Sequence, residues 1–261
     1  MGVADGGHGG SRCYNRPSRT LLTERRDRAP MTSSVRRAVR LEHRLTQPNA
    51  SLADLEAAVE LAIRHDIAAI TVNPWLVKGA KRALGGSRVA LGTVVGYPHG
   101  THVLSVKAFE ASRALEQGAT EIDFVLNGGA LASGDDEAVV NDMLAVIDMA
   151  HSALAAVGVI IEAEPMSEEL VRRACRLAER AGADHLVTSP GGATARGTVA
   201  RTRLLRDSVG PRLGIKACGR FRNAEQLGAA GAAGATRLSV VFTAGLARQA
   251  AEAPQLAGSA S

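Results

Sequence analysis

Short apolar runs rich in β-branched residues alternate with longer amphipathic stretches along most of the chain. There are eight such runs, each six to nine residues long, and several are apolar at successive positions rather than at every second one. Strands that are apolar on both faces are typical of a parallel sheet covered by helices. We expect strands over residues 38–43, 68–73, 88–96, 121–127, 158–164, 184–189, 212–217 and 236–241.

The stretches between these runs carry apolar residues at helical spacing. Residues 51–66 open with Ser51, a residue type that caps helix N-termini, and residues 102–118 end at Gly118, a residue type that terminates helices. Further helices are expected over residues 137–158, 167–182, 198–210 and 223–234.

Eight strand–helix units predict the fold class. About 220 residues hold all eight, which fits a closed (β/α)8 TIM barrel of the α/β class better than an open, doubly wound sheet. No G-x-G-x-x-G follows the first predicted strand, so a dinucleotide-binding domain is not indicated. We expect a barrel over residues 36–250, between a basic disordered extension over 1–35 and a disordered tail over 251–261.

Composition limits the partners and the cellular compartment that this barrel is expected to have. The net charge is +5, but the first 30 residues hold six arginines against three acidic residues, so the charge is weak evidence for a nucleic-acid partner. No apolar run approaches the roughly 18 residues of a membrane helix. The cysteines Cys13, Cys175 and Cys218 are scattered and odd in number, which does not suggest a disulfide framework. We therefore expect a cytoplasmic protein without membrane or nucleic-acid partners.

Two charged residues stand inside otherwise apolar strands. Asp123 lies in the run 121–127 and Lys216 in the run 212–217. A buried charge is costly unless it is paired or functional. One interpretation is that each closes a buried ion pair with a neighbour. The other is that a carboxylate and an amine face one pocket at the C-terminal ends of the strands, where they suit proton transfer or Schiff-base chemistry.

Other side chains near the strand ends support weaker hypotheses. Glu162 and Glu164 could join Asp123 as acid and base of a metal-free lyase or isomerase. His43, His99 and His102 could converge, but no cysteine or carboxylate lies at ligand spacing around them. We therefore expect neither a metal site nor a cofactor.

Several longer motifs carry a resemblance to a known family. They cover about residues 40–245 in order, and they resemble the deoxyribose-phosphate aldolase family. The motifs are AITVNPWLV, LGTVVGYPHGTHVLSVKAFEASRALEQGATEID, VGPRLGIKACGRFR and GAAGATRL. The resemblance implies a metal-free class I aldolase, a lyase that cleaves 2-deoxyribose 5-phosphate to glyceraldehyde 3-phosphate and acetaldehyde through a Schiff base, and a possible homodimer.

The resemblance also assigns roles to single residues. The aspartate of the family's fourth strand, which takes part in proton relay, corresponds to Asp123, and the lysine of its seventh strand corresponds to Lys216. The family's sixth strand reads Lys-Thr-Ser-Thr-Gly, and the matching residues here begin with Val187. The Schiff-base lysine is therefore absent. Of four lysines, three are expected on outer helices, so Lys216 is the one candidate amine.

The turns that hold phosphate in the family also differ in this chain. Arg220 replaces a glycine after the seventh strand, and Val241 and Phe242 stand in place of a small polar run after the eighth. By resemblance, the residues expected to bind substrate are Asn73, Thr188, Ser189, Gly191, Gly219, Arg220, Ser239 and Thr243.

Two functional hypotheses follow from these departures. The first is an aldolase-type lyase that uses Lys216 as its amine and Asp123 as its proton relay. The second is a non-catalytic relative that binds a small phosphorylated or carboxylated ligand, with Arg220 as an anion contact.

Overall fold

The barrel predicted from the strand pattern is present and closed. A computed structural model describes residues 39–162, 166–190 and 194–252, within a compact unit that begins at Arg37. Eight parallel strands pair in chain order, and β1 pairs with β8 to close the sheet. The strands are β1 (Arg40–Leu45), β2 (Ala69–Val72), β3 (Ala90–Val95), β4 (Glu121–Val125), β5 (Ala156–Ile161), β6 (His185–Thr188), β7 (Gly214–Cys218) and β8 (Arg237–Val240).

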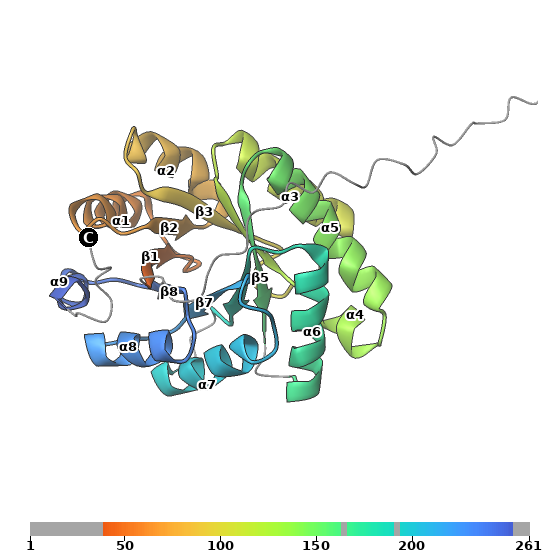
Figure 1. The fold of residues 1–261 in the computed structure, drawn as a ribbon. Helices are drawn as coiled ribbons and strands as arrows, with labels where there is room; N and C mark the ends of the chain where they lie inside the picture. The colour runs from red at the N-terminus through yellow and green to blue at the C-terminus, as the bar shows by residue number, and fades with distance from the viewer. Residues whose placement is uncertain (1–38, 163–165, 191–193, 253–261) are drawn as a thin grey trace, which may run out of the picture. The chain divides into compact units, whose positions relative to one another are not determined.

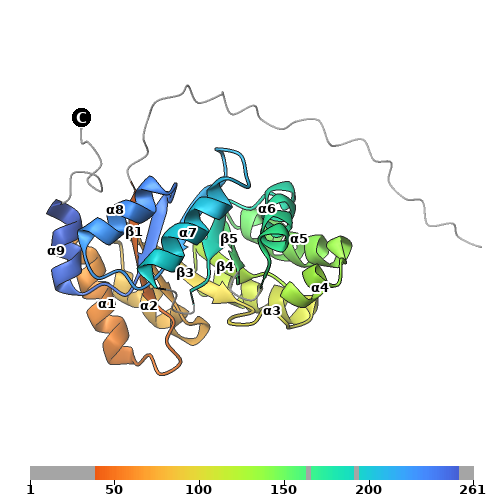
Figure 2. The same ribbon diagram turned by 90° about the horizontal axis from the view of Figure 1, so that it is seen from below.

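Helices surround the strands, and Figure 1 shows α5 beside α3, with α4 outside α5 and α6. Seen after a quarter turn, the same helices lie on the outside of the sheet (Figure 2). The helices are α1 (Leu52–Arg64), the 3-10 turn η1 (Pro74–Leu76), α2 (Val77–Leu84), α3 (Leu104–Glu116), α4 (Gly128–Ala132), α5 (Asp136–Ser152), α6 (Glu168–Ala181), α7 (Ala195–Arg206), α8 (Ala224–Ala232) and α9 (Ala244–Glu252).

Local sequence explains where helices begin and end. Ser51 caps α1, since its hydroxyl accepts from the Asp54 amide while the Asp54 carboxylate accepts from the Ser51 amide. Gly182 ends α6 with φ of 90°, a left-handed conformation that glycine adopts without a steric penalty.

The alternation of side chains along each strand separates two environments. Outward-facing residues such as Ile70, Ile122 and Phe124 are buried against the helices and form the main hydrophobic core. One ion pair lies in this outer layer: Lys107 Nζ on α3 is 2.5 Å from Asp142 Oδ2 on α5 and 4.7 Å from the centre of the Phe124 ring. Lys107 is therefore committed to helix packing, away from the barrel interior.

Several predicted boundaries are corrected by the structure. The helix predicted over 137–158 ends at Ser152, and β5 runs over Ala156–Ile161 rather than 158–164. Helices α4 and α9 lie in segments where no helix was predicted, and α9 extends to Glu252, inside the expected tail. The predicted extension over 1–35 lies outside the described residues, as does the rest of the tail.

Among the described helices, none is long and apolar enough to cross a bilayer.

Candidate active site

Lys216 and Asp123 contact each other inside the barrel. The Lys216 Nζ lies 2.9 Å from both carboxylate oxygens of Asp123 and 2.9 Å from Oε2 of Glu42. Lys216 is 1% exposed and Glu42 is 0% exposed. The interpretation of a buried ion pair therefore describes the geometry. Neither Lys216 nor Asp123 is among the residues that line the three cavities described below.

A second cation completes the charged layer. Arg237 Nη1 lies 3.2 Å from Glu42 Oε2 and also donates to Glu121. The other oxygen of Glu42 accepts from Thr71 at 2.9 Å and from Ser239 at 2.7 Å. These contacts join β1, β2, β4, β7 and β8. We call the five charged residues of this group the charged layer: Glu42, Glu121, Asp123, Lys216 and Arg237.

Burial and neighbouring charges shift the pKa values of the charged layer in opposite directions. Burial alone would raise the pKa of Glu42, but Lys216 and Arg237 lower it to about 2. Burial raises the pKa of Asp123 to about 6, because the attraction of Lys216 only partly offsets it and the Glu42 carboxylate adds to it. Burial alone would lower the pKa of Lys216, but its carboxylate neighbours raise it well above its ordinary value. The amine is therefore held as an ammonium ion, whereas imine formation needs a neutral amine.

An apolar layer covers the charged layer on the side of the strand C-termini. Val187 lies among buried residues from neighbouring strands, and Tyr97 packs against the group. A Cβ added at Gly158 would lie 2.7 Å from Val187 Cγ2 and 2.5 Å from Asp123 Oδ1, so the valine lies directly beside the carboxylate. The members of this layer are Val94, Val125, Ile160, Val187 and Cys218.

The mouth pocket is a cavity of about 420 Å³ at the C-terminal ends of the strands. Gly219 and Arg220, both predicted to bind substrate, line it. Arg44 and Phe221 line it as well, and the sequence did not point to them as site residues. Arg44 directly follows the strand predicted over 38–43, and a charged residue at the C-terminal end of a predicted barrel strand was the signal that could have identified it. The lining residues are Arg44, Thr46, Gln47, Pro48, Tyr97, Pro190, Gly219, Arg220, Phe221 and Val241.

Three of the predicted hydroxyls serve other contacts. Ser239 lies in the barrel interior, where it donates to Glu42. The hydroxyl of Thr188 accepts from the amide of Cys218 at 2.8 Å and donates to its carbonyl, so it joins β6 to β7. Thr243 accepts from the amide of Leu246 in the first turn of α9.

The remaining predicted residues lie around the strand ends. Asn73 donates to the carbonyl of Gln47 at 2.8 Å and thereby holds the loop after β1. Ser189 lies 3.4 Å from the Ile161 carbonyl and lines a separate cavity beside α7. Gly191 lies outside the described residues, as does Glu164.

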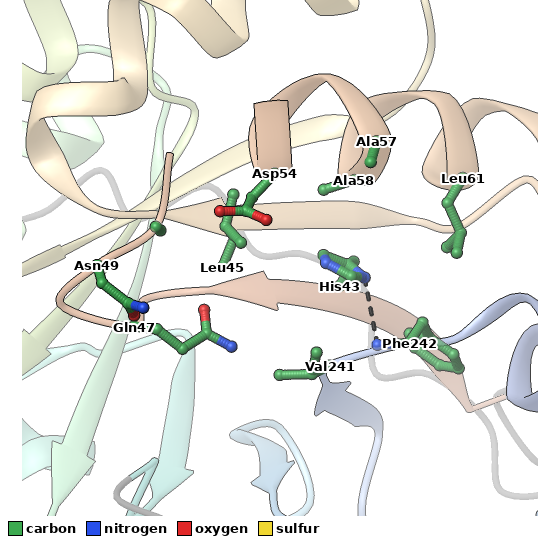
Figure 3. Close-up of a pocket in the computed structure, with 11 residues that line it drawn as sticks. His43, Leu45, Gln47, Asn49, Asp54, Ala57, Ala58, Leu61, Val241 and Phe242 are labelled. Atoms are coloured by element: carbon green, nitrogen blue, oxygen red, sulfur yellow. Dashed lines mark hydrogen bonds between the residues drawn. The ribbon is translucent and has the colours of Figure 1, made fainter. Parts of the chain in front are cut away.

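A cavity of about 360 Å³ lies between α1 and the outer face of β1 (Figure 3). His43 lines it, and its Nδ1 accepts from the amide of Phe242 at 3.2 Å, which leaves the ring proton on Nε2. Burial, with a smaller effect of the neighbouring Arg44, lowers the pKa of His43 to about 4. His99 and His102 are exposed, and no group of three or more metal-ligating side chains occurs within residues 39–162, 166–190 and 194–252.

The fold and the site define a class of protein: a closed (β/α)8 barrel whose interior holds a lysine on its seventh strand in contact with an aspartate on its fourth. Residues 30–210 match the DeoC/LacD family aldolase. The chain is 42% identical to a deoxyribose-phosphate aldolase of Thermococcus gammatolerans over 200 residues, covering 76% of this chain and 89% of the relative. A deoxyribose-phosphate aldolase of Geobacillus sp. (strain WCH70) is 41% identical over 198 residues, which is 76% of this chain and 88% of that protein.

A solved structure agrees with these matches. The deoxyribose phosphate aldolase from Aeropyrum pernix, described as a unique tetrameric structure, superposes with a TM-score of 0.70 at 28% identity. The superposition covers 83% of this chain and 91% of that one. The chain belongs to the DeoC/LacD aldolase family, and within that lyase family it is deoxyribose-phosphate aldolase-like.

Proposed function

We propose that the protein binds a small phosphorylated or carboxylated carbonyl compound in the mouth pocket, and that it does so without the Schiff base of the resembling family. Family membership and the relatives' names support a small carbonyl or sugar-phosphate ligand. Gly219 and Arg220 are the predicted substrate-binding residues that line this pocket, and a guanidinium suits a phosphate or carboxylate group.

The protonation and burial of the Lys216 amine support the proposal that no Schiff base forms. The ammonium of Lys216 donates to Asp123 and lies 2.9 Å from Glu42, and the apolar layer lies between it and the mouth. Breaking two buried charge contacts to free the amine would cost several kcal/mol, because Asp123 would lose its counter-ion and Glu42 would keep only Arg237. Val187 supplies no substitute, since it has no amine.

A combined binding and turnover measurement tests this function. We expect 2-deoxyribose 5-phosphate or glyceraldehyde 3-phosphate to raise the unfolding temperature saturably, because a ligand that binds only the folded state stabilises it. We expect no release of acetaldehyde from 2-deoxyribose 5-phosphate in the same samples. Steady release of acetaldehyde by the purified protein would contradict the proposal.

One observation favours a second candidate, aldol cleavage through an imine on Lys216. The amine and the Asp123 carboxylate, whose pKa is raised to about 6, are 2.9 Å apart, which is the contact that a proton relay needs. Borohydride reduction in the presence of acetaldehyde, followed by peptide mass spectrometry, decides between the two. A reduced adduct on Lys216 supports the lyase, and an unmodified Lys216 supports ligand binding without the imine.

We also propose that the chain self-associates. The homodimer expected from the resemblance is consistent with an assembly in the family, since the Aeropyrum pernix relative is described as tetrameric. The beginning of α3 offers a surface for it: the N-cap residue Val103 and the helix residues Val106 and Phe109 are 67%, 47% and 68% exposed.

A further inference from the structure

Arg44 holds a buried guanidinium that has no partner among the residues that the structure describes. It lies on β1 two residues beyond Glu42, which places it nearer the mouth than the charged layer. It is 8% exposed and lines the mouth pocket. Within the described residues its side chain makes no hydrogen bond or ion pair, and its Nη1 is buried without any partner.

This arrangement is unusual because buried charges are normally paired. Two carboxylates of the charged layer below it already have cationic partners: Glu42 contacts Lys216 and Arg237, and Asp123 contacts Lys216. The polar atoms of Arg44 thus meet the cavity and the apolar layer, where Cys218 is close enough for the cation to oppose the burial that raises the thiol pKa to about 11. The guanidinium of Arg44 gains a counter-ion only when an anion enters the cavity.

We propose that Arg44 binds the carboxylate of a small organic acid at the inner end of the mouth pocket. A guanidinium presents paired N–H donors that match the two oxygens of a carboxylate. The inference rests on the proposed function and narrows it, because a carboxylate at the inner end makes the ligand an oxo acid rather than a neutral aldehyde. Arg220, which is exposed at the rim, meets the outer end of such a ligand.

Replacing Arg44 by methionine separates a ligand-binding role from a structural one. R44M keeps the length of the side chain and removes the unpaired buried charge, so the ligand-free variant is expected to unfold at a higher temperature than the wild type. Pyruvate is the probe for the carboxylate, and calorimetry is expected to give roughly tenfold or more weaker binding to R44M. R40M is the matched control, because Arg40 lies on the same strand and is exposed. We expect R40M to bind pyruvate like the wild type.

The outcomes separate this inference from the proposed function. Suppose that 2-deoxyribose 5-phosphate binds the wild type, and that R44M and R40M have the same affinity for it and for pyruvate. The inference about Arg44 is then wrong, and the proposed function stands. If R44M loses stability without ligand and keeps its affinity for pyruvate, Arg44 is structural and the inference fails. Inorganic phosphate that binds through Arg44 while pyruvate does not would overturn the assignment to a carboxylate. No saturable binding of any probe to the wild type would contradict the proposed function itself.

Discussion

At the scale of one residue, Val187 places an apolar side chain in the barrel interior beside the charged layer. Its side chain packs with Val125, Ile160 and Cys218 and is 0% exposed. The resemblance places the Schiff-base lysine of the family at this position, where a neighbouring cation would lower the pKa of that lysine. In this chain the remaining lysine has carboxylate neighbours instead of a second lysine, so its pKa moves in the opposite direction.

Restoring the lysine should restore the capacity for an imine. In V187K the new amine would lie beside Lys216, whose Cα is the register partner of residue 187 on β7. The ammonium of Lys216 is expected to lower the pKa of the new amine, as one cation does to another. Borohydride trapping with acetaldehyde should give an adduct on residue 187.

The matched control is V187M, which adds similar length without an amine. It should give no adduct and should lose about 1–3 kcal/mol of stability from overpacking. A folded V187K that gives no adduct would contradict this prediction.

His43 gives a prediction about pH. Its pKa is about 4 in the folded protein and 6.5 in its ordinary state, so the unfolded chain binds the proton more readily. The stabilising contribution is complete above about pH 6.5 and is lost as the pH falls towards 4. H43N keeps an acceptor for the Phe242 amide but does not titrate. We expect urea unfolding to show that the wild type loses about 2–3 kcal/mol more than H43N between pH 7 and pH 4.

Other titrating groups do not mask this difference. The pKa of His185 is lowered, like that of His43, and the pKa of Asp123 is raised. Both groups are present in the wild type and in H43N, so their contributions cancel in the comparison. Equal losses in the two proteins would show that His43 is protonated in the folded state.

At the scale of elements, the sequence pattern predicted all eight strands, and their pairing order follows from the barrel prediction. The strands are apolar at successive positions because helices cover their outer face and side chains fill the interior. Helix α4 was missed because its five residues are too few to show helical periodicity. Arg44 was missed as a site residue because a linear sequence does not say which of its neighbours bind a buried charge.

The ion pair between α3 and α5 is a test of element packing. K107M should lower the free energy of unfolding by about 3 kcal/mol, because it leaves the carboxylate of Asp142 buried without its cation. The double variant K107M/D142L should recover most of the loss, since both charges are then gone. K78M is the control, because Lys78 is exposed on α2, and it should change stability by less than about 0.5 kcal/mol in urea unfolding. A loss in K107M no larger than in K78M would show that the pair does not stabilise the packing.

At the scale of the whole molecule, the exposed apolar side chains of α3 give a prediction about assembly. Light scattering coupled to size-exclusion chromatography should give the wild type a mass that is a multiple of the chain mass. F109E should shift the mass towards a monomer, because a charge would be buried in the contact. L154E is the control, since Leu154 is 95% exposed on another part of the surface, and it should leave the mass unchanged. A monomeric wild type would contradict the proposal of self-association.

Closure of the barrel also has a consequence for synthesis of the chain. Glu42 on β1 bonds to Arg237 and Ser239 on β8, across 195 and 197 residues of sequence. A nascent chain that ends before β8 therefore has two open strand edges and one buried carboxylate without two of its donors. Translation must deliver almost the whole barrel before the first strand has all its partners, so the edge of β1 stays open to pairing with other chains until β8 has been made.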